Sequence, residues 1–209
     1  MKNIDTKYLS KTKYILAGTD EAGRGPLAGP VVAAAVILPE KCIDNRINDS
    51  KKLSSGLREE LFEIIKKEAL AYSYTIISHK KIDEINILNA SLLAMKKSVQ
   101  KLDIQPDIIL VDGNKSFEYN ASVIPVVKGD TKSMSIASAS IIAKVVRDKI
   151  MKKLASEYPV YKWESNKGYP TKEHIDAVLK FGACPLHRKT FLRKIFEKAA
   201  QTEIMFTEQ

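Results

Sequence analysis

The sequence predicts an α/β protein in which helices flank a mixed β-sheet, with a helical extension at the C-terminal end. Short apolar runs typical of buried strands alternate with longer segments whose apolar residues recur at helical spacing, and helical patterns alone close the chain. With 209 residues, 44% of them apolar, the chain is long enough to bury a substantial core. We expect a single domain over residues 1–209, with a helical portion over about 171–200 and a flexible tail over 201–209.

Five segments have the pattern of strands. The second of them is a continuous apolar run, which predicts a strand buried on both faces. A Gly/Pro-rich link joins it to the first strand, and Pro106 introduces the fourth. In chain order, the expected strands are 14–19, 31–38, 72–78, 107–111 and 122–127.

Five further segments have helical spacing. In the first of them, apolar residues fall at positions 57, 61, 64, 65 and 69 between charged ones, and either Ser54 or Ser55 is placed to cap the helix. The fourth begins after the Gly/Pro-containing block around residue 170. The expected helices are 57–70, 82–102, 133–155, 171–181 and 187–200.

Four acidic residues lie where apolar strands stop. Asp20 and Glu21 follow the first strand, Asp112 the fourth and Asp130 the fifth. One acid at a strand end is usually a turn former, but ligand sites in open α/β sheets gather at such ends. Three strands that deliver acids to this position therefore predict one shared site.

Adjacent acids pose a geometric difficulty. Neighbouring residues of a regular strand point to opposite faces, so Asp20 and Glu21 do not both face one site unless the chain bends. Gly23 and Gly25 are close enough to permit a bend. Alternatively, Glu21 reaches the site from the side, and the sequence does not choose between the two arrangements.

The ligand types predict a hard divalent cation. Four carboxylates without clustered histidines or cysteines favour Mg²⁺ or Mn²⁺ over zinc. Two such ions about 3.5 to 4 Å apart can hydrolyse a phosphodiester without a side-chain nucleophile. The remaining metal-ligand types, His79, His174, His187, Cys42 and Cys184, are scattered, and we expect both cysteines to be free thiols.

The net charge of +9 is concentrated near the C-terminal end. Residues 144–198 hold 14 Lys and Arg against 6 Asp and Glu. A basic surface beside an acidic pocket suits an enzyme that cuts nucleic acid. The chain has no apolar run long enough to span a membrane and no apolar core of a secretory signal near its first residue, so we expect a cytoplasmic protein, monomeric by default.

The segment 23–28 also fits the G-x-G-x-x-G/A pattern of dinucleotide-binding proteins. That pattern requires a helix to begin inside the motif. Here Pro26 and Pro30 lead into the apolar run 31–38, which has the character of a strand. We therefore reject a dinucleotide site and expect Arg24 and the backbone of Gly23 and Gly25 to lie against a sugar-phosphate chain.

Seven blocks, in the same order, resemble the bacterial ribonuclease HII family. They run from about residue 14 to residue 191, so the resemblance covers most of the chain. Because only about 13 residues precede the first strand, the chain resembles type HII more than the longer type HIII enzymes. The blocks are residues 18–32 (GTDEAGRGPLAGPVV), 48–53 (NDSKKL), 111–114 (VDGN), 128–130 (KGD), 140–148 (SIIAKVVRD), 166–171 (NKGYPT) and 187–191 (HRKTF).

This resemblance implies a ribonuclease H-like fold and an endonuclease that hydrolyses the RNA strand of RNA-DNA hybrids. It also implies cutting on the 5′ side of single ribonucleotides in duplex DNA, by two ions of Mn²⁺ or Mg²⁺, as ribonucleotide excision repair requires. Asp20, Glu21, Asp112 and Asp130 correspond to the catalytic, metal-binding acids. Gly23, Arg24 and Gly25 correspond to the motif that senses the 2′-hydroxyl, and Tyr169 to the ring that packs on the following deoxyribose.

Lys51, Lys52 and Lys167 are candidate phosphate contacts, whereas His187 and Arg188 are either structural or close to the substrate backbone. Thr19 and Ser138 depart from the family pattern without removing a site residue. The alternative from another class is a catalytically silent protein that binds RNA-DNA hybrids. Residues 201–206 loosely resemble a peptide that docks on the replication sliding clamp, and a frayed tail is the other interpretation.

Overall fold

A computed structural model of the chain describes residues 4–9, 14–40, 43–48, 50–193 and 195–197. Within these residues five strands form a mixed sheet in the order β3-β2-β1-β4-β5. Strand β1 pairs antiparallel with β2 and parallel with β4, β2 pairs antiparallel with β3, and β4 pairs parallel with β5. The strands are β1 (Leu16–Ala22), β2 (Val31–Ile37), β3 (Ala71–Ile77), β4 (Ile108–Asp112) and β5 (Ser122–Val126).

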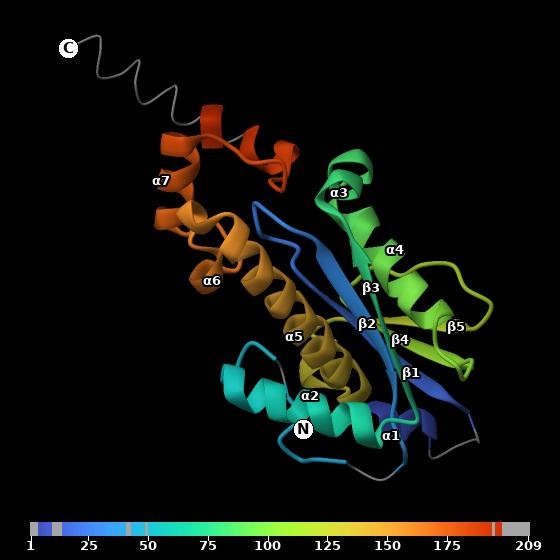
Figure 1. Cartoon of the computed structure of the whole chain (residues 1–209). Coiled ribbons are helices and arrows are strands. Elements are labelled where there is room, and N and C mark those ends of the chain that lie inside the picture. Colours follow the sequence, from blue (N-terminus) through green and yellow to red (C-terminus); the bar gives the residue numbers. More distant parts are fainter. Residues whose placement is uncertain (1–3, 10–13, 41–42, 49, 194, 198–209) are drawn as a thin grey trace.

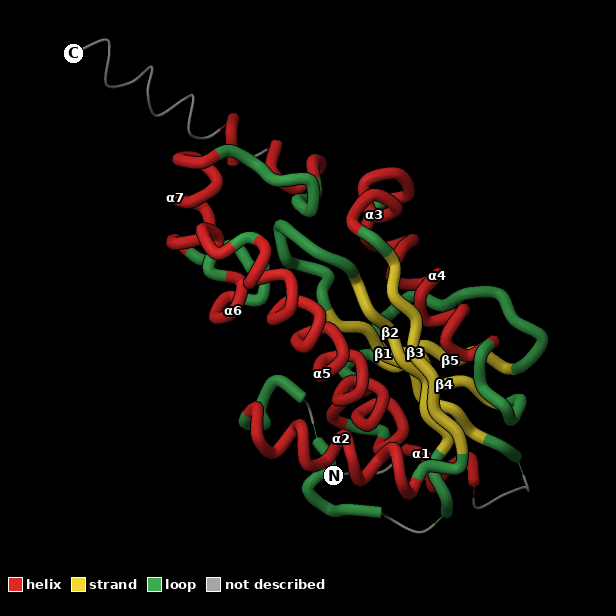
Figure 2. Tube along the Cα trace, viewed as in Figure 1, coloured by secondary structure: helices red, strands yellow, loops and turns green. Residues whose placement is uncertain are grey.

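Helices cover both faces of this sheet (Figures 1 and 2). On β2, Ala33 and Ala35 pack on the side of α4 (Ile87–Gln100), whereas Ala34 and Val36 pack on the side of α2 (Ser55–Glu68) and α5 (Met134–Glu157). Because side chains alternate along a strand, one fully apolar strand can supply two cores. The predicted burial of the second strand on both faces is confirmed.

The helix starts follow capping chemistry that is visible in the sequence. Ser54 accepts a hydrogen bond from Leu57 N at the start of α2, Ser133 accepts one from Ile136 N in α5, and Thr171 accepts one from His174 N in α7 (Lys172–Phe181). Ser54 is therefore the cap of the first predicted helix. These side chains satisfy N–H groups that lack a partner within the helix.

The single helix predicted for 82–102 is wrong in one respect. The chain forms two helices, α3 (His79–Ile85) and α4, which are separated by Asn86. Asn86 has a φ of 64°, outside the right-handed helical region, and its side chain accepts a hydrogen bond from Asn89 N. The apolar spacing continues across this break, so periodicity alone does not reveal it.

The C-terminal extension packs on the end of α5. Trp163, Tyr161, Val178 and Met151 belong to one buried cluster. The elements of this part that the pattern missed are short: the 3-10 helix η2 (Pro159–Tyr161) and α6 (Trp163–Asn166). Residues 189–193 and 195–197 are helical as expected, and residues 201–209 lie outside the described part.

The first described residues also touch α5. Helix α1 (Ile4–Leu9), which no pattern predicted, places Asp5 against the N-terminal turn of α5, where its carboxylate accepts hydrogen bonds from Ser135 N and Oγ. A carboxylate at this end of a helix is favourable for the helix dipole. Among the described residues no helix is long and apolar enough to cross a membrane.

Candidate active site

Asp20 and Glu21 lie inside β1, which continues in regular pairing to Ala22. The bend that would have turned both acids to one face does not occur at these residues. Asp20 is 4% exposed and lies on the face covered by α5, and Glu21 has a nearly buried side chain. Thr19 pairs with Val111 of the parallel strand β4, so Asp20 and Asp112 are the next residues along two neighbouring strands.

These acids act on one another electrostatically. Burial raises the pKa of Asp20 well above its usual value, and the charges of Glu21 and Asp112 raise it further. Burial also raises the pKa of Glu21; nearby Arg24 opposes this shift, and Asp112 adds to it. Burial and neighbouring negative charge thus disfavour the ionised forms of Asp20 and Glu21, which gives the site an electrostatic preference for a cation.

Asp112 and Asp130 approach each other through backbone. Gly129 N donates a hydrogen bond to Asp112 Oδ1 across 2.7 Å, and Asp130 follows Gly129 in the 3-10 helix η1 (Gly129–Thr131). A Cβ at Gly129 would lie 2.5 Å from Ile136 Cδ1 and 3.1 Å from Asp112 Oδ1. The absence of a side chain at this position therefore lets the two acidic segments meet.

The donor set fits a hard divalent cation, although it is not closed around one point. Among the described residues no three acidic, histidine or cysteine side chains gather closely enough to hold a metal ion as they stand. Asp130 Oδ2 lies 3.8 Å from Lys51 Nζ, whose side chain is 78% exposed. The Asp130 side chain is nearly buried, whereas the lysine side chain extends into solvent, so this long ion pair does not fix the position of Asp130.

The loop after β1 presents backbone and one arginine next to Tyr169. Gly23 has a φ of 102°, and a Cβ there would lie 2.2 Å from Arg147 Nε, so only glycine fits. A Cβ placed on Gly25 would lie 3.7 Å from Tyr169 Cε1. Arg24 is half exposed, with Nη1 3.4 Å from Glu21 Oε1. The dinucleotide pattern requires a helix that begins inside the motif, and no helix begins in this loop.

Two fully buried arginines hold this loop from behind. Arg188 donates hydrogen bonds to the carbonyl oxygens of Gly23, Arg24, Gly29 and Pro30, over 2.7 to 3.2 Å. Arg147 donates to those of Ala28, Pro30 and Lys167, over 3.0 to 3.3 Å. Among the described residues neither guanidinium has a salt bridge to a carboxylate.

The sequence analysis left Arg188 undecided and did not single out Arg147. A signal for Arg147 was available, since it lies four residues after Ala143 and four before Met151, both buried on α5. An arginine inside the apolar stripe of a helix must find several acceptors in the interior. Here the acceptors are backbone carbonyl oxygens of distant loops, which the sequence around Arg147 does not predict.

Tyr169 has a partly exposed ring next to two cations. It is 37% exposed, and Lys144 Nζ and Arg147 Cζ lie 5.8 and 5.6 Å from the ring centroid. Of the lysines proposed as phosphate contacts, Lys51 and Lys52 are exposed, and Lys167 is half-buried with its ammonium bonded to Glu164 O. Of these cations, Lys51 lies next to Asp130, as Arg24 lies next to Glu21, whereas Lys144 and Arg147 lie at the Tyr169 ring.

A hydrogen-bonded chain of histidines ends at Tyr169. Cys184 N donates to His187 Nδ1, which leaves His187 Nε2–H to donate to His174 Nε2 over 3.1 Å. Trp163 Nε1 also donates to His174 Nε2, so His174 Nδ1–H donates to the carbonyl oxygen of Tyr169. Both rings must be neutral for this arrangement, and burial lowers the pKa of each.

The family model for Ribonuclease HII matches residues 17–199 of the chain. A relative named Ribonuclease HII from Caldanaerobacter subterraneus subsp. tengcongensis is 51% identical over 197 residues, which cover 94% of this chain and 82% of that protein. A second, of the same name, from Caldicellulosiruptor bescii is 52% identical over 192 residues, which cover 92% and 93%.

Solved structures show the same likeness. The crystal structure of ribonuclease H2 from Pyrococcus horikoshii OT3 superposes with a TM-score of 0.72 at 32% identity, over 88% of this chain and 97% of that one. The structure of a PCNA:RNase HII complex from Archaeoglobus fulgidus gives a TM-score of 0.69 at 28% identity, over 84% of this chain and 94% of that one.

Proposed function

The chain belongs to the ribonuclease HII family of metal-dependent endonucleases with a ribonuclease H-like fold, and we propose that it cuts on the 5′ side of single ribonucleotides in duplex DNA as well as within RNA-DNA hybrids. Water attacks the phosphorus as the bond to the 3′ oxygen breaks. The products are a 3′-hydroxyl and a 5′-phosphate. Asp20, Glu21, Asp112 and Asp130 are the proposed catalytic acids.

The observation that carries this proposal is the position of Asp20, which is buried in β1 beside Glu21 and next to Asp112 of the neighbouring strand β4. Desolvation and the charges of its neighbours together raise the pKa of Asp20. A bound cation would offset these negative charges, and oxygen ligands suit Mn²⁺ or Mg²⁺. Two such ions would activate the attacking water and stabilise the leaving oxygen.

The loop after β1 and Tyr169 are proposed to distinguish ribose from deoxyribose. The 2′-hydroxyl is what distinguishes RNA from DNA at one sugar, and backbone groups of Gly23 and Gly25 can approach it without an intervening side chain. Arg24 supplies the charge for a neighbouring phosphate. Because the Tyr169 ring lies next to Gly25, we expect the sugar that follows the ribonucleotide to pack on this ring. A 2′-hydroxyl on that following sugar would collide with the ring.

The basic surface supplies non-specific affinity for the duplex. Lys51, Lys52 and Lys167 are proposed to contact its phosphates, because each lies on a loop beside the acids or Tyr169. A second proposed partner is a sliding clamp, bound through residues 201–206. The Archaeoglobus fulgidus RNase HII was solved in a complex with PCNA. A clamp pull-down that is unchanged after removal of 201–209 would eliminate these residues as the clamp-binding segment.

The proposed function is tested with labelled duplex DNA that carries one ribonucleotide, beside the same duplex without it. We expect a cut just 5′ of the ribonucleotide with Mn²⁺ or Mg²⁺, no cut with chelator and none in the all-DNA control. Binding without a cut would instead indicate the silent hybrid-binding alternative. A cut that occurs only in long hybrids would remove the assignment of single-ribonucleotide specificity.

A further inference from the structure

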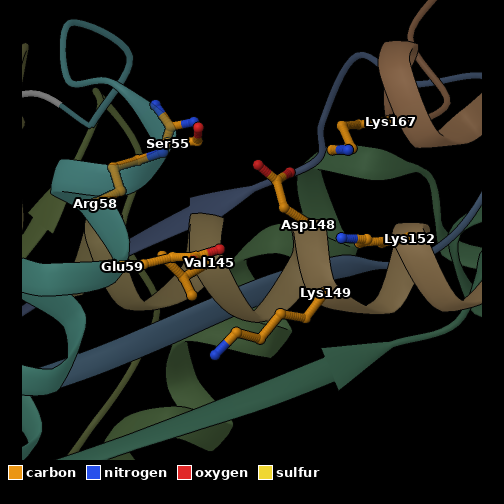
Figure 3. A pocket seen from close by; sticks show the side chains of 8 residues that line it. All are labelled: Ser55, Arg58, Glu59, Val145, Asp148, Lys149, Lys152 and Lys167. Carbon is orange, nitrogen blue, oxygen red and sulfur yellow. The ribbon is translucent and has the colours of Figure 1, made fainter.

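A concave surface lies between α2 and α5 and reaches Lys167, two residues before Tyr169 (Figure 3). It encloses about 220 Å³ and is lined by four cationic side chains, Arg58, Lys149, Lys152 and Lys167, and by two acidic ones, Glu59 and Asp148. Figure 3 shows Arg58 and Glu59 on one wall, with Asp148 and Lys149 on the helix opposite and Lys167 above them. None of Arg58, Lys149 and Lys152 belongs to the proposed catalytic or sugar-reading residues.

The charges of this pocket do not cancel. Lys144 Nζ lies 2.8 Å from Asp148 Oδ1, so that carboxylate is already paired with a cation outside the pocket lining. Lys149 Nζ lies 4.8 Å from the centre of the Phe62 ring rather than against a carboxylate. Lys152 has no carboxylate within salt-bridge distance in the part of the chain that the structure describes. Positive charge is therefore left over inside a concave surface.

The pocket contacts two segments that are proposed to bind the substrate, the loop with Lys51 and Lys52 and the residues next to Tyr169. Arg58 Nη1 donates to the carbonyl oxygens of Ser50 and Leu53, which bracket the loop that carries Lys51 and Lys52. On the other side, the Lys144 that pairs with Asp148 also lies over the Tyr169 ring, and Lys167 is two residues before Tyr169. A strand that passes Tyr169 has the pocket directly beside it.

We propose that this pocket binds a backbone phosphate of the duplex beyond the nucleotides that contact Tyr169, with Lys149 and Lys152 as the principal contacts. The inference rests on the proposed function, because it uses Tyr169 to place the duplex. Lysine ammonium groups bind phosphate as point charges and do not read bases. The contact therefore increases the length of duplex that the protein covers without adding a sequence preference. Its expected signature is affinity that depends on duplex length and salt.

The test compares Lys149→Gln/Lys152→Gln with the control Lys96→Gln/Lys97→Gln. The control removes the same charge from α4, on the opposite face of the sheet. Glutamine removes the charge and keeps the first two methylene groups of each lysine side chain. Affinity is measured in chelator, where no cutting occurs, for duplexes of increasing length over a range of salt concentrations.

For long duplexes we expect the pocket variant to bind about tenfold more weakly than wild type, with a salt dependence of log K shallower by about one for each lysine removed. For duplexes too short to pass Tyr169, the two proteins should bind equally. The control variant should match wild type throughout. Equal binding of the pocket variant and wild type at every length and salt concentration would overturn the proposal.

A second measurement locates the phosphate. In a series of duplexes, one phosphate at a time is replaced by a neutral methylphosphonate, and wild type should lose affinity at one flanking position where the pocket variant loses none. Equal losses for both proteins at every position would contradict a phosphate subsite. All-DNA duplexes serve equally well, so failure of ribonucleotide-specific cutting leaves this test intact.

The same chemistry is offered by small phosphorylated molecules. We therefore titrate inorganic phosphate and tripolyphosphate into wild type and into the pocket variant. Weak binding of these anions with no difference between the two proteins is expected if the pocket is built for the duplex. Tight binding that the two substitutions abolish, together with unchanged duplex affinity, would assign the pocket to a free anion and overturn the proposal.

Discussion

Arg188 Nη2 donates a hydrogen bond to the carbonyl oxygen of Gly23 over 2.7 Å, across 165 positions of the sequence. The same guanidinium binds the carbonyl oxygens of Arg24, Gly29 and Pro30. The C-terminal extension therefore fixes the shape of the loop that is proposed to read the 2′-hydroxyl. Without this anchor the protein would keep its acidic residues, but the loop would no longer hold the conformation proposed to contact the 2′-hydroxyl.

Replacement of Arg188 by lysine tests whether this arginine anchors the loop after β1. Lysine retains the charge but cannot reproduce the planar set of donors, so buried carbonyl oxygens lose their partners. We expect the free energy of unfolding to fall by about 2 to 4 kcal/mol, with a larger loss of cutting at single ribonucleotides than in long hybrids. The control is Arg193→Lys, since Arg193 is 81% exposed and pairs with Glu197. Equal behaviour of the two variants in urea unfolding would contradict the anchoring role.

Asp112→Asn tests the acidic site. The amide keeps the shape of the side chain and can still accept the hydrogen bond from Gly129 N, but it removes one negative charge from the site. We expect cutting to fall by at least about 10³-fold, while hybrid binding and the unfolding midpoint remain close to wild type. Binding of Mn²⁺, followed by calorimetry, should weaken. Near-normal turnover with Mg²⁺ would show that Asp112 is not a ligand.

Tyr169→Ala tests the junction reading. The exposed ring lies next to Gly25, Lys144 and Arg147, so its loss opens the position proposed for the following deoxyribose. We expect kcat/KM at a single embedded ribonucleotide to fall about 10- to 100-fold, and less within a long hybrid. Tyr169→Phe, which keeps the ring, should behave as wild type. Equal losses on both substrates would make Tyr169 a general binding residue.

The histidine pair predicts instability in acid. Burial, helped by the neighbouring His174, lowers the pKa of His187 to about 4 in the folded protein, whereas the unfolded chain keeps a value near 6.5. Between these values the unfolded chain binds a proton that the folded one does not, so stability is complete above pH 6.5 and falls as the pH decreases toward 4. The contribution lost is about 2 to 3 kcal/mol.

This prediction has an internal probe. Trp163 is the only tryptophan of the chain and donates to His174, so its fluorescence reports the state of the pair. Urea unfolding of wild type and His187→Gln should be compared at several pH values from 4 to 7. The variant should lose less stability than wild type over this window, although the raised pKa values of Asp20 and Glu21 act in the opposite direction in both proteins. Parallel curves would contradict a titrating His187.

Local patterns predicted what is decided locally. The burial of β2 on both faces and the Ser54 cap of α2 follow from short-range rules, and the structure contains both. The break at Asn86 and the continuation of β1 through Glu21 were missed, since the first depends on a left-handed residue and the second on pairing with β2. Arg147 and the histidine chain depend on contacts between distant segments, which no window of sequence contains.

Two serines of α5 give a final matched prediction. Ser138 and Ser140 are both buried, but Ser138 Oγ has no hydrogen-bond partner among the described residues, whereas Ser140 Oγ lies 2.8 Å from Ser50 Oγ. A buried hydroxyl without a partner costs about 1 to 3 kcal/mol, so Ser138→Ala should stabilise the protein by about 1 kcal/mol. Ser140→Ala should destabilise it by a similar amount, because Ser50 is then left without its partner. Thermal unfolding of the two variants measures both effects. A loss of stability in Ser138→Ala would contradict the prediction, because it would show that the Ser138 hydroxyl contributes a stabilising interaction.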